Sequence, residues 1–161
     1  KSFVCVNHVI SNTVVAERCR GFADGLGIKL GNSMMDSGQD PSEIKNRVLA
    51  YLSAHPNTDA ILTLGPTSAD PTIAALKENG MAGDIYFGTF DLGTEIVKAI
   101  KSGIIMWGID QQPFLQAYLP VVVLANYDRY GVLPGNNINS GPGFVTKDGL
   151  TLVEKYAGKY R

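Results

Sequence analysis

The sequence predicts an α/β protein with a doubly wound parallel sheet. Five short apolar runs alternate along the chain with four helical patterns, the order typical of parallel strands joined by crossover helices. The first run is apolar at consecutive positions, as expected of a strand that is buried on both faces of a sheet. The 161 residues fit one domain with a sizeable core, and 18 glycines allow many tight turns.

The composition excludes several classes of protein. Charged residues make up 18% of the chain and hydrophobic residues 45%, which is ordinary for a soluble globular domain. The net charge of −1 gives no basic footprint for nucleic acid. The longest apolar stretch, residues 114–125, is broken by Gln116 and Pro120 and is too short to span a bilayer. We therefore expect no nucleic-acid partner.

The first strand is predicted over residues 1–7, and a helix follows it. Asn12 or Thr13 can cap this helix, because short polar side chains accept hydrogen bonds from the free N–H groups of the first turn. Gly25 and Gly27 end the helix. Its apolar positions recur at helical spacing and are Val15, Cys19, Phe22 and Leu26.

A second strand is predicted over residues 28–35, before a helix with a well-marked start. Asp40 stands at its N-cap, with proline at the first helical position and glutamate at the third. This helix ends at residues 55–57, and its buried stripe comprises Ile44, Val48, Leu49 and Leu52. The third strand is predicted over residues 60–64.

Residues 65–69 are predicted to form a loop after the third strand. Asp70 and Pro71 then repeat the pattern of a capping residue followed by proline, and predict a helix that runs to Gly80. The fourth strand is predicted over residues 85–90. The next helix has its apolar positions at Ile96, Val97 and Ile100 and ends at Gly103.

The chain changes character after the fifth strand, which is predicted over residues 104–109. Residues 111–128 form one long helical pattern that is apolar on much of its circumference. A helix of that kind should be buried on more than one side. A turn rich in Gly, Pro and Asn follows at residues 131–139, and the short segment 143–146 leads into a polar tail.

The end of the fourth strand is the strongest candidate for a site. In an open parallel sheet, ligands bind beyond the carboxyl ends of the strands, where Phe90 and Asp91 stand. A flat apolar ring beside a carboxylate suits a sugar, which has an apolar face and hydroxyl donors at its rim. The alternative is that Phe90 is part of the core and Asp91 caps the next helix.

The two cysteines leave two outcomes open. Cys5 lies on the first predicted strand and Cys19 two turns into the first helix, so a helix packed on its own strand can bring them within disulfide range. An oxidising compartment would favour the bond. Otherwise both are small buried hydrophobic residues.

Several catalytic, cofactor and metal motifs are absent from the sequence. The loop after the first strand, residues 8–12, has neither Gly-x-Gly-x-x-Gly nor a Walker pattern, and no acidic pair of a receiver domain accompanies that strand. Ser68, His8 and Asp91 lie at the same sheet edge, but no nucleophile elbow supports a hydrolase. His8 and His55 lack partners at metal-binding spacing. We expect no cofactor, no metal and no catalysis.

Six segments carry a family resemblance by their order and spacing. They are Glu17-Arg18-Cys19-Arg20-Gly21-Phe22, Ser53-Ala54-His55-Pro56, Thr58-Asp59-Ala60-Ile61, Phe90-Asp91, Asp110-Gln111-Gln112-Pro113 and Gly141-Pro142-Gly143-Phe144-Val145-Thr146. Together they resemble the C-terminal lobe of a type I periplasmic sugar-binding protein of the ribose-binding-protein-like group. Effector cores of LacI-type repressors share this fold, but the last two segments are similar to those of the transporter group.

The resemblance implies that residues 1–161 are one lobe of a two-lobe protein. In the family, three hinge strands join the lobes and the sugar is clamped between them. An N-terminal lobe is then expected before Lys1, with hinge crossings near Asp110 and near residues 139–141. The helical segment 111–139 is expected to pack on that missing lobe, which would explain its apolar character.

The resemblance also assigns roles to four residues. Arg18 matches an arginine that donates to sugar hydroxyls, and Asp91 matches a carboxylate that accepts from two of them. Phe90 matches the aromatic residue before that carboxylate. Gln111 matches a hinge glutamine, which can donate and accept at once.

Three further positions depart from the family pattern. Gln39 falls where some relatives have an aromatic residue, so its role is open. Gly65 falls where relatives often carry asparagine, with Thr67 as the nearest hydroxyl substitute. Asp40 is better explained as the helix cap than as a sugar contact.

The function expected from the resemblance is that of the solute-binding component of a sugar ABC importer. It would bind a monosaccharide or polyol, present it to a membrane permease, and reside in the periplasm or on the cell surface as a membrane-anchored receptor. The alternatives are the effector core of a LacI-type repressor and a small α/β hydrolase or isomerase.

Overall fold

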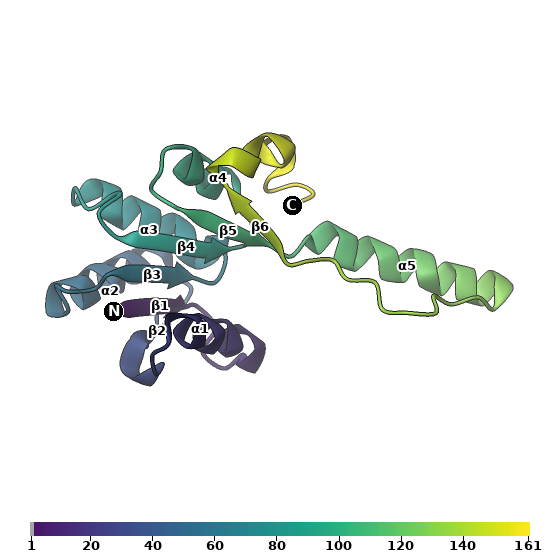
Figure 1. Ribbon diagram of the computed structural model, residues 1–161, viewed down its shortest axis with the longest axis horizontal. Coiled ribbons are helices and arrows are strands. Elements are labelled where there is room, and N and C mark those ends of the chain that lie inside the picture. Colours follow the sequence, from purple (N-terminus) through teal and green to yellow (C-terminus); the bar gives the residue numbers. More distant parts are fainter. Residues whose placement is uncertain (1) are drawn as a thin grey trace.

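The computed structural model describes residues 2–161 and contains one six-stranded sheet in the order β2-β1-β3-β4-β5-β6 (Figure 1). Lys1, which the sequence places in the first strand, lies outside the described residues. Five strands pair in parallel: β1 (Phe3–Asn7), β2 (Met34–Asp36), β3 (Ala60–Thr63), β4 (Tyr86–Phe90) and β5 (Trp107–Asp110). β6 (Gly143–Thr146) runs antiparallel to β5. The predicted α/β sheet is therefore confirmed, with one antiparallel edge strand added.

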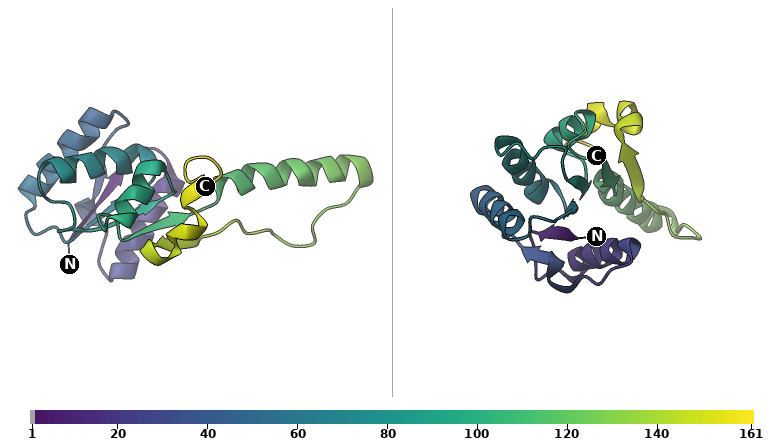
Figure 2. Two further views of the ribbon diagram at one scale, coloured as in Figure 1. Left: turned by 90° about the horizontal axis from the view of Figure 1, so that it is seen from above. Right: turned by 60° about the vertical axis from the view of Figure 1, so that its left-hand side comes forward.

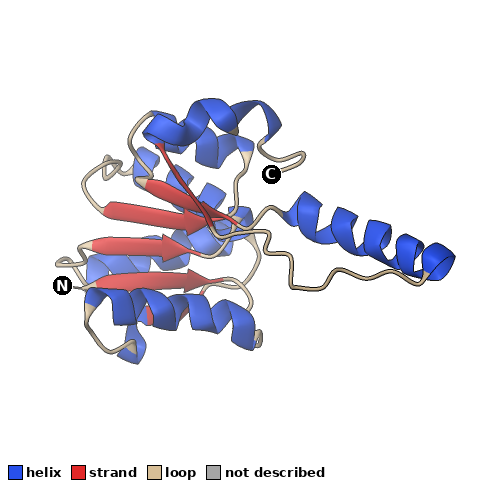
Figure 3. Ribbon diagram, turned by 45° about the vertical axis from the view of Figure 1, so that its right-hand side comes forward, coloured by secondary structure: helices blue, strands red, loops and turns tan. Residues whose placement is uncertain are grey.

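Five α-helices connect or follow these strands: α1 (Thr13–Leu26), α2 (Pro41–Ala54), α3 (Pro66–Glu78), α4 (Thr94–Lys101) and α5 (Pro113–Tyr130). Three short 3₁₀ segments accompany them: η1 (Gly31–Ser33), η2 (Lys147–Leu152) and η3 (Glu154–Tyr156). Helices lie on both faces of the sheet (Figure 3).

The core consists of two apolar clusters, one on each face of the sheet. Alternate residues of a strand enter different clusters, because successive side chains point to opposite faces. In β1, Val4 and Val6 join the larger cluster under α2, α3, α4 and η2. Phe3 and Cys5 join the smaller cluster under α1.

Two predicted helix starts are confirmed. The Asn12 side chain accepts hydrogen bonds from the Val14 and Val15 N–H groups at the start of α1. The Asp40 side chain accepts one from the Glu43 N–H, so Asp40 is the N-cap of α2. Both carboxamide and carboxylate oxygens thus satisfy donors that have no partner within the helix.

The predicted start of the third helix at Asp70 is wrong. α3 begins at Pro66, because the Gly65 carbonyl accepts from both the Ser68 and Ala69 N–H groups and proline fits the first helical position. Pro71 consequently lies inside the helix, where its lack of an N–H forfeits one intrahelical hydrogen bond. The predicted loop 65–69 is the first turn of α3.

Two strand predictions were too long at their amino ends. Instead of residues 28–35, β2 holds only Met34–Asp36, because η1 precedes it. β5 is Trp107–Asp110, since the Ile104 and Ile105 N–H groups both bond back to the Ala99 carbonyl at the end of α4. In both cases the prediction extended the strand over apolar residues that lie before it in a non-strand segment.

α5 extends away from the sheet, and the returning segment 131–142 runs beside it (Figures 1 and 2). None of its residues is buried. The apolar circumference that predicts burial is therefore not covered within the described chain. No helix among residues 2–161, α5 included, combines the length and hydropathy that crossing a bilayer requires.

Candidate functional site

The carboxyl ends of the parallel strands meet at the edge from which α5 departs (Figure 1). His8 follows β1, Gly65 follows β3 after one residue, and Asp91 follows β4 directly. Gln111 comes directly after β5. The strand order β1-β3-β4-β5 thus aligns four loop residues that are far apart in the sequence. This edge is where an open parallel sheet binds its ligands.

Asp91 is held by an unusual backbone turn rather than by a helix. Its φ angle is 60°, in the left-handed region, and its N–H donates to the Ile109 carbonyl at 2.8 Å. The N-cap of α4 is Gly93, with no side-chain cap. The alternative interpretation of Asp91 as a helix cap is therefore wrong. Strain of this kind is concentrated at functional sites, where surrounding structure enforces it.

Gln111 links the acceptor and donor of the site. Its Nε2 donates to Asp91 Oδ1 at 2.7 Å, and its Oε1 accepts from Arg18 Nη2 at 3.4 Å. The side-chain amide of Gln111 thus donates to the Asp91 carboxylate and accepts from the Arg18 guanidinium.

Arg18 is fixed by α1 and by two further partners. Its Nη1 donates to the Leu64 carbonyl at 3.0 Å. The guanidinium carbon lies 4.5 Å from the centre of the Phe90 ring, in cation–π range. Phe90 is only partly buried. Arg18 is thereby held close enough to Asp91 and His8 for its charge to affect the pKa of both.

A disulfide ties the arginine-bearing helix to the sheet. Cys5 of β1 and Cys19 of α1 are bonded, with their Cα atoms 5.7 Å apart. Both side chains are fully buried in the cluster under α1. Because Cys19 adjoins Arg18 in sequence, the bond also restricts where the guanidinium can move.

Gly65 lies between two polar side chains of the site. A Cβ placed on this glycine would lie 3.7 Å from Asp91 Oδ2 and 3.7 Å from His8 Cε1. The imidazole Nδ1 of His8 is 3.3 Å from the Ser68 hydroxyl. Asp91 and His8 therefore flank the same glycine, and both belong to the site.

Burial and neighbouring charges set the protonation of the site. Burial raises the pKa of Asp91, although the Gln111 hydrogen bond and the Arg18 charge act against it. Burial also lowers the pKa of His8, with a further contribution from Arg18. The site therefore favours a neutral imidazole beside one carboxylate and one guanidinium.

The structure unites five of the seven predicted binding residues: Arg18, Phe90, Asp91, Gln111 and Gly65. Gln39 and Thr67 are exposed and lie outside this hydrogen-bonded cluster. The sequence assigned His8 no binding role, because a polar residue after a strand is a common feature. Its place directly after β1 is the signal that marks it.

The geometry does not favour a hydrolase. Ser68 contacts His8, but its side chain is fully buried and its Oγ accepts from the Leu64 N–H at 3.2 Å. A nucleophile must be open to its substrate. Across residues 2–161, no group of three or more His, Cys, Asp or Glu side chains is arranged to hold a metal ion.

A buried ion pair lies where α5 leaves the sheet. Asp110 is fully buried, and its Oδ2 accepts from Arg161 Nη1 at 2.5 Å. Its Oδ1 accepts from the Gln112 N–H at 2.8 Å. The polar tail thereby returns to the point at which residue 111 enters the site.

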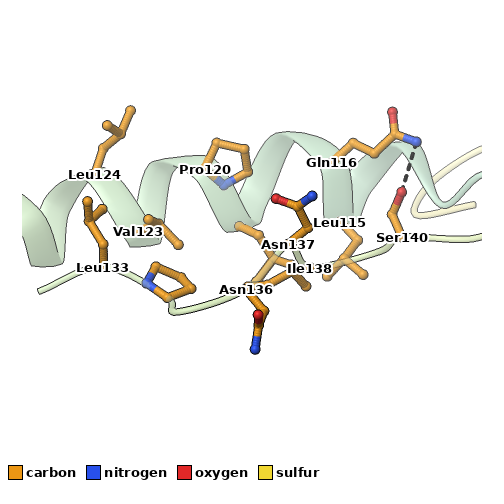
Figure 4. A pocket seen from close by; sticks show the side chains of 12 residues that line it. Leu115, Gln116, Pro120, Val123, Leu124, Leu133, Asn136, Asn137, Ile138 and Ser140 are labelled. Carbon is orange, nitrogen blue, oxygen red and sulfur yellow. Dashed lines mark hydrogen bonds between the residues drawn. The ribbon is translucent and has the colours of Figure 1, made fainter.

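A cavity of about 580 Å³ lies between α5 and the returning segment, away from the Asp91 site (Figure 4). Leu115, Val123 and Ile138 line it, and Gln116 Nε2 donates to Ser140 Oγ at 3.0 Å at one end. Its apolar lining is exposed to solvent on an extended helix, so we do not assign it to the ligand site.

Comparison with known proteins gives a consistent picture. A family model described as "periplasmic binding protein domain" matches residues 1–129. The xylose/arabinose-binding protein XylF of Sulfolobus acidocaldarius is 27% identical over 126 residues, which cover 73% of this chain and 31% of that protein.

Solved structures extend the likeness over nearly the whole chain. A carbohydrate transporter from Acidothermus cellulolyticus, in complex with myo-inositol, matches 97% of this chain with a TM-score of 0.82 and 28% identity. A periplasmic sugar-binding protein from Legionella pneumophila matches 88% with a TM-score of 0.77 and 26% identity. The present chain covers 54% and 53% of those chains, so it spans about half their length.

Proposed function

Because this chain belongs to the periplasmic binding protein domain family, we propose that it is the C-terminal lobe of a solute receptor for a sugar ABC importer. The ligand is a neutral monosaccharide or polyol, bound between this lobe and an N-terminal lobe. The receptor functions by capture and release and has no catalytic role.

The observation that carries the proposal is the linked set Arg18, Gln111 and Asp91 beside the Phe90 ring. A sugar hydroxyl donates one hydrogen bond and accepts others, so it matches a carboxylate acceptor next to a guanidinium donor. Phe90 is partly buried and Arg18 lies over its ring, so the part of the ring left uncovered provides the apolar surface for the C–H face of the sugar. The cluster thus supplies each kind of contact that such a ligand needs.

The charge of the site favours a neutral ligand over an anionic one. The positive charge of Arg18 is offset by the Asp91 carboxylate, and burial keeps His8 uncharged. An acidic sugar or a phosphate would meet Asp91 with no surplus positive charge to compensate for the repulsion. Neutral polyols avoid this cost.

A second lobe and a permease complete the proposed receptor. Related structures are about twice as long as this chain, and α5, which extends away from the sheet, has no buried residue. We infer that α5 packs on the N-terminal lobe and that closure of the two lobes creates the surface for a membrane permease. The family and the disulfide support a periplasmic or cell-surface location, where oxidising conditions maintain such bonds.

The relatives favour a transport receptor over the core of a repressor. XylF is named for xylose and arabinose, and the Acidothermus protein holds myo-inositol. Pentoses and cyclic polyols are therefore the first ligands to examine.

A thermal-shift screen of the full-length receptor tests the proposal. Pentoses, hexoses and polyols are each added in excess, with a sugar acid as the anionic comparison. A ligand that binds only the native state raises the melting temperature, and the rise grows with the logarithm of the ratio of its concentration to its Kd. We expect a shift with at least one neutral sugar or polyol and none with the acid. The absence of a shift with every neutral compound would reject the proposed function.

A further inference from the structure

We propose that His8 is a specificity-determining residue that contacts the ligand beside Asp91. This inference rests on the proposed sugar-binding function and adds a residue and a contact to it. The recognised group is a ligand hydroxyl that lies between the His8 imidazole and the Asp91 carboxylate.

Gly65 brings the His8 and Asp91 side chains together at the edge of the sheet. A Cβ placed on Gly65 would lie 3.7 Å from His8 Cε1 and 3.7 Å from Asp91 Oδ2, so the two side chains flank the same residue. Gly65 is buried, whereas His8 and Asp91 are only partly buried. Both side chains are therefore accessible to a ligand bound at this edge.

The imidazole is held in place from behind. His8 Nδ1 lies 3.3 Å from the hydroxyl of Ser68, a fully buried residue in the first turn of α3. The Ser68 oxygen is itself held by the Leu64 N–H. An orienting contact on one ring nitrogen fixes the ring and leaves the other nitrogen for a ligand.

The free nitrogen can serve a sugar in either tautomer. If Nδ1 donates to Ser68, Nε2 is an acceptor, and if Nδ1 accepts, Nε2 is a donor. A hydroxyl can meet both arrangements, because it donates and accepts. The Asp91 carboxylate takes only hydrogen-bond donors, so a hydroxyl between the two residues donates to one and still pairs with the other.

The charged groups around His8 support the neutral form. Arg18 of α1 and burial both lower its pKa, while Asp91 at the end of β4 acts in the opposite direction. A protonated imidazole would stand as a second cation beside Arg18. The neutral ring adds hydrogen-bonding selectivity without attracting anionic ligands.

The test uses the full-length receptor and calorimetry with D-xylose, L-arabinose and myo-inositol as probes. The tightest of these is then compared with its monodeoxy analogues. We expect His8→Ala to weaken the affinity for the parent sugar roughly threefold to tenfold, because one uncharged hydrogen bond to the ligand is lost. For one deoxy analogue the same substitution should have a smaller effect, because the contacted hydroxyl is already gone. His8→Gln, which keeps a donor and an acceptor, should restore part of the affinity.

His55→Ala is the matched control, because this exposed histidine lies at the opposite end of α2 from the site and contacts the Tyr51 carbonyl. It should leave every affinity unchanged. Equal loss for the parent and all deoxy analogues, or unchanged affinity in His8→Ala, would overturn the role of His8 while leaving the sugar-binding function intact. Failure of the wild-type receptor to bind any probe or other neutral sugar would reject the function and this inference together.

Discussion

Asp91 combines a strained backbone, partial burial and a raised pKa in one residue. Each of these features opposes folding, yet its carboxylate is positioned by Gln111 and faces the guanidinium of Arg18. Such an arrangement is typical of a residue retained for binding rather than for stability. Gln111, which partly offsets the cost of its burial, also fixes the position of its carboxylate through a hydrogen bond to Oδ1.

We predict that Asp91→Asn makes the ligand-free protein more stable at neutral pH. A carboxyl whose pKa is raised by folding is less stable when ionised in the folded state, so its contribution to stability falls as pH rises through that pKa. Asparagine removes this effect. Thermal melts from acidic to neutral pH should show the gain growing with pH. A variant that is less stable at neutral pH would contradict the assigned electrostatics.

The roles of single residues were only partly predictable from the sequence. Arg18 and Gln111 were assigned by family resemblance, since nothing in their local pattern distinguishes them from surface polar residues. The proposed role of His8 was not predicted: the sequence placed it at one sheet edge with Ser68 and Asp91, but a polar residue after a strand is a common feature. Its contact with Ser68 and its closeness to Asp91 at Gly65 arise only in the tertiary structure.

The elements follow local signals wherever these are strong. α1 and α2 begin at their predicted caps, since Asn12 and Asp40 supply acceptors to free N–H groups. α3 begins earlier than expected, because Gly65 and Pro66 provide a start before Asp70 does. The short edge strands were poorly predicted, as three or four residues carry little periodicity.

We predict that the Cys5–Cys19 bond stabilises the lobe by about 2–4 kcal/mol, since it closes a loop with a sequence separation of 14. Replacing both cysteines with alanine should lower the free energy of unfolding by this amount in denaturant titrations. Mass spectrometry without reductant should find the bridged peptide in protein exported to an oxidising compartment. Free alkylation of both thiols in the native, unreduced protein would refute the bond.

The whole molecule is a folded lobe with one helix, α5, that the rest of the described chain does not bury. α5 projects from the sheet, and several of its apolar residues are more than half exposed: Tyr118, Val121, Leu124, Tyr127 and Tyr130. The sequence predicted that this helix is buried, whereas none of its residues is buried within the described chain, and periodicity alone does not identify what would cover it. Related structures of about twice the length are in keeping with an N-terminal lobe as the partner.

We predict that the isolated 161-residue chain self-associates through α5 and binds sugar weakly. Exposed apolar patches favour association, and a single lobe supplies only part of the contacts of a clamped ligand. Replacing Val121 with glutamate and Leu124 with lysine should restore a monomer in analytical ultracentrifugation. Asp24→Lys on α1 is a control that leaves α5 unchanged. A monodisperse wild-type monomer with micromolar sugar affinity would contradict the two-lobe account.

The central claim is that the Asp91 carboxylate binds ligand hydroxyls at the edge of this sheet. Calorimetry of the full-length receptor with its best neutral sugar tests it directly, with wild type compared with Asp91→Ala and with the exposed control Asp24→Ala. Loss of a charged acceptor leaves ligand donors unpaired, so we predict that Asp91→Ala weakens binding about tenfold or more while Asp24→Ala has no effect. Equal affinity in wild type and Asp91→Ala would contradict the account.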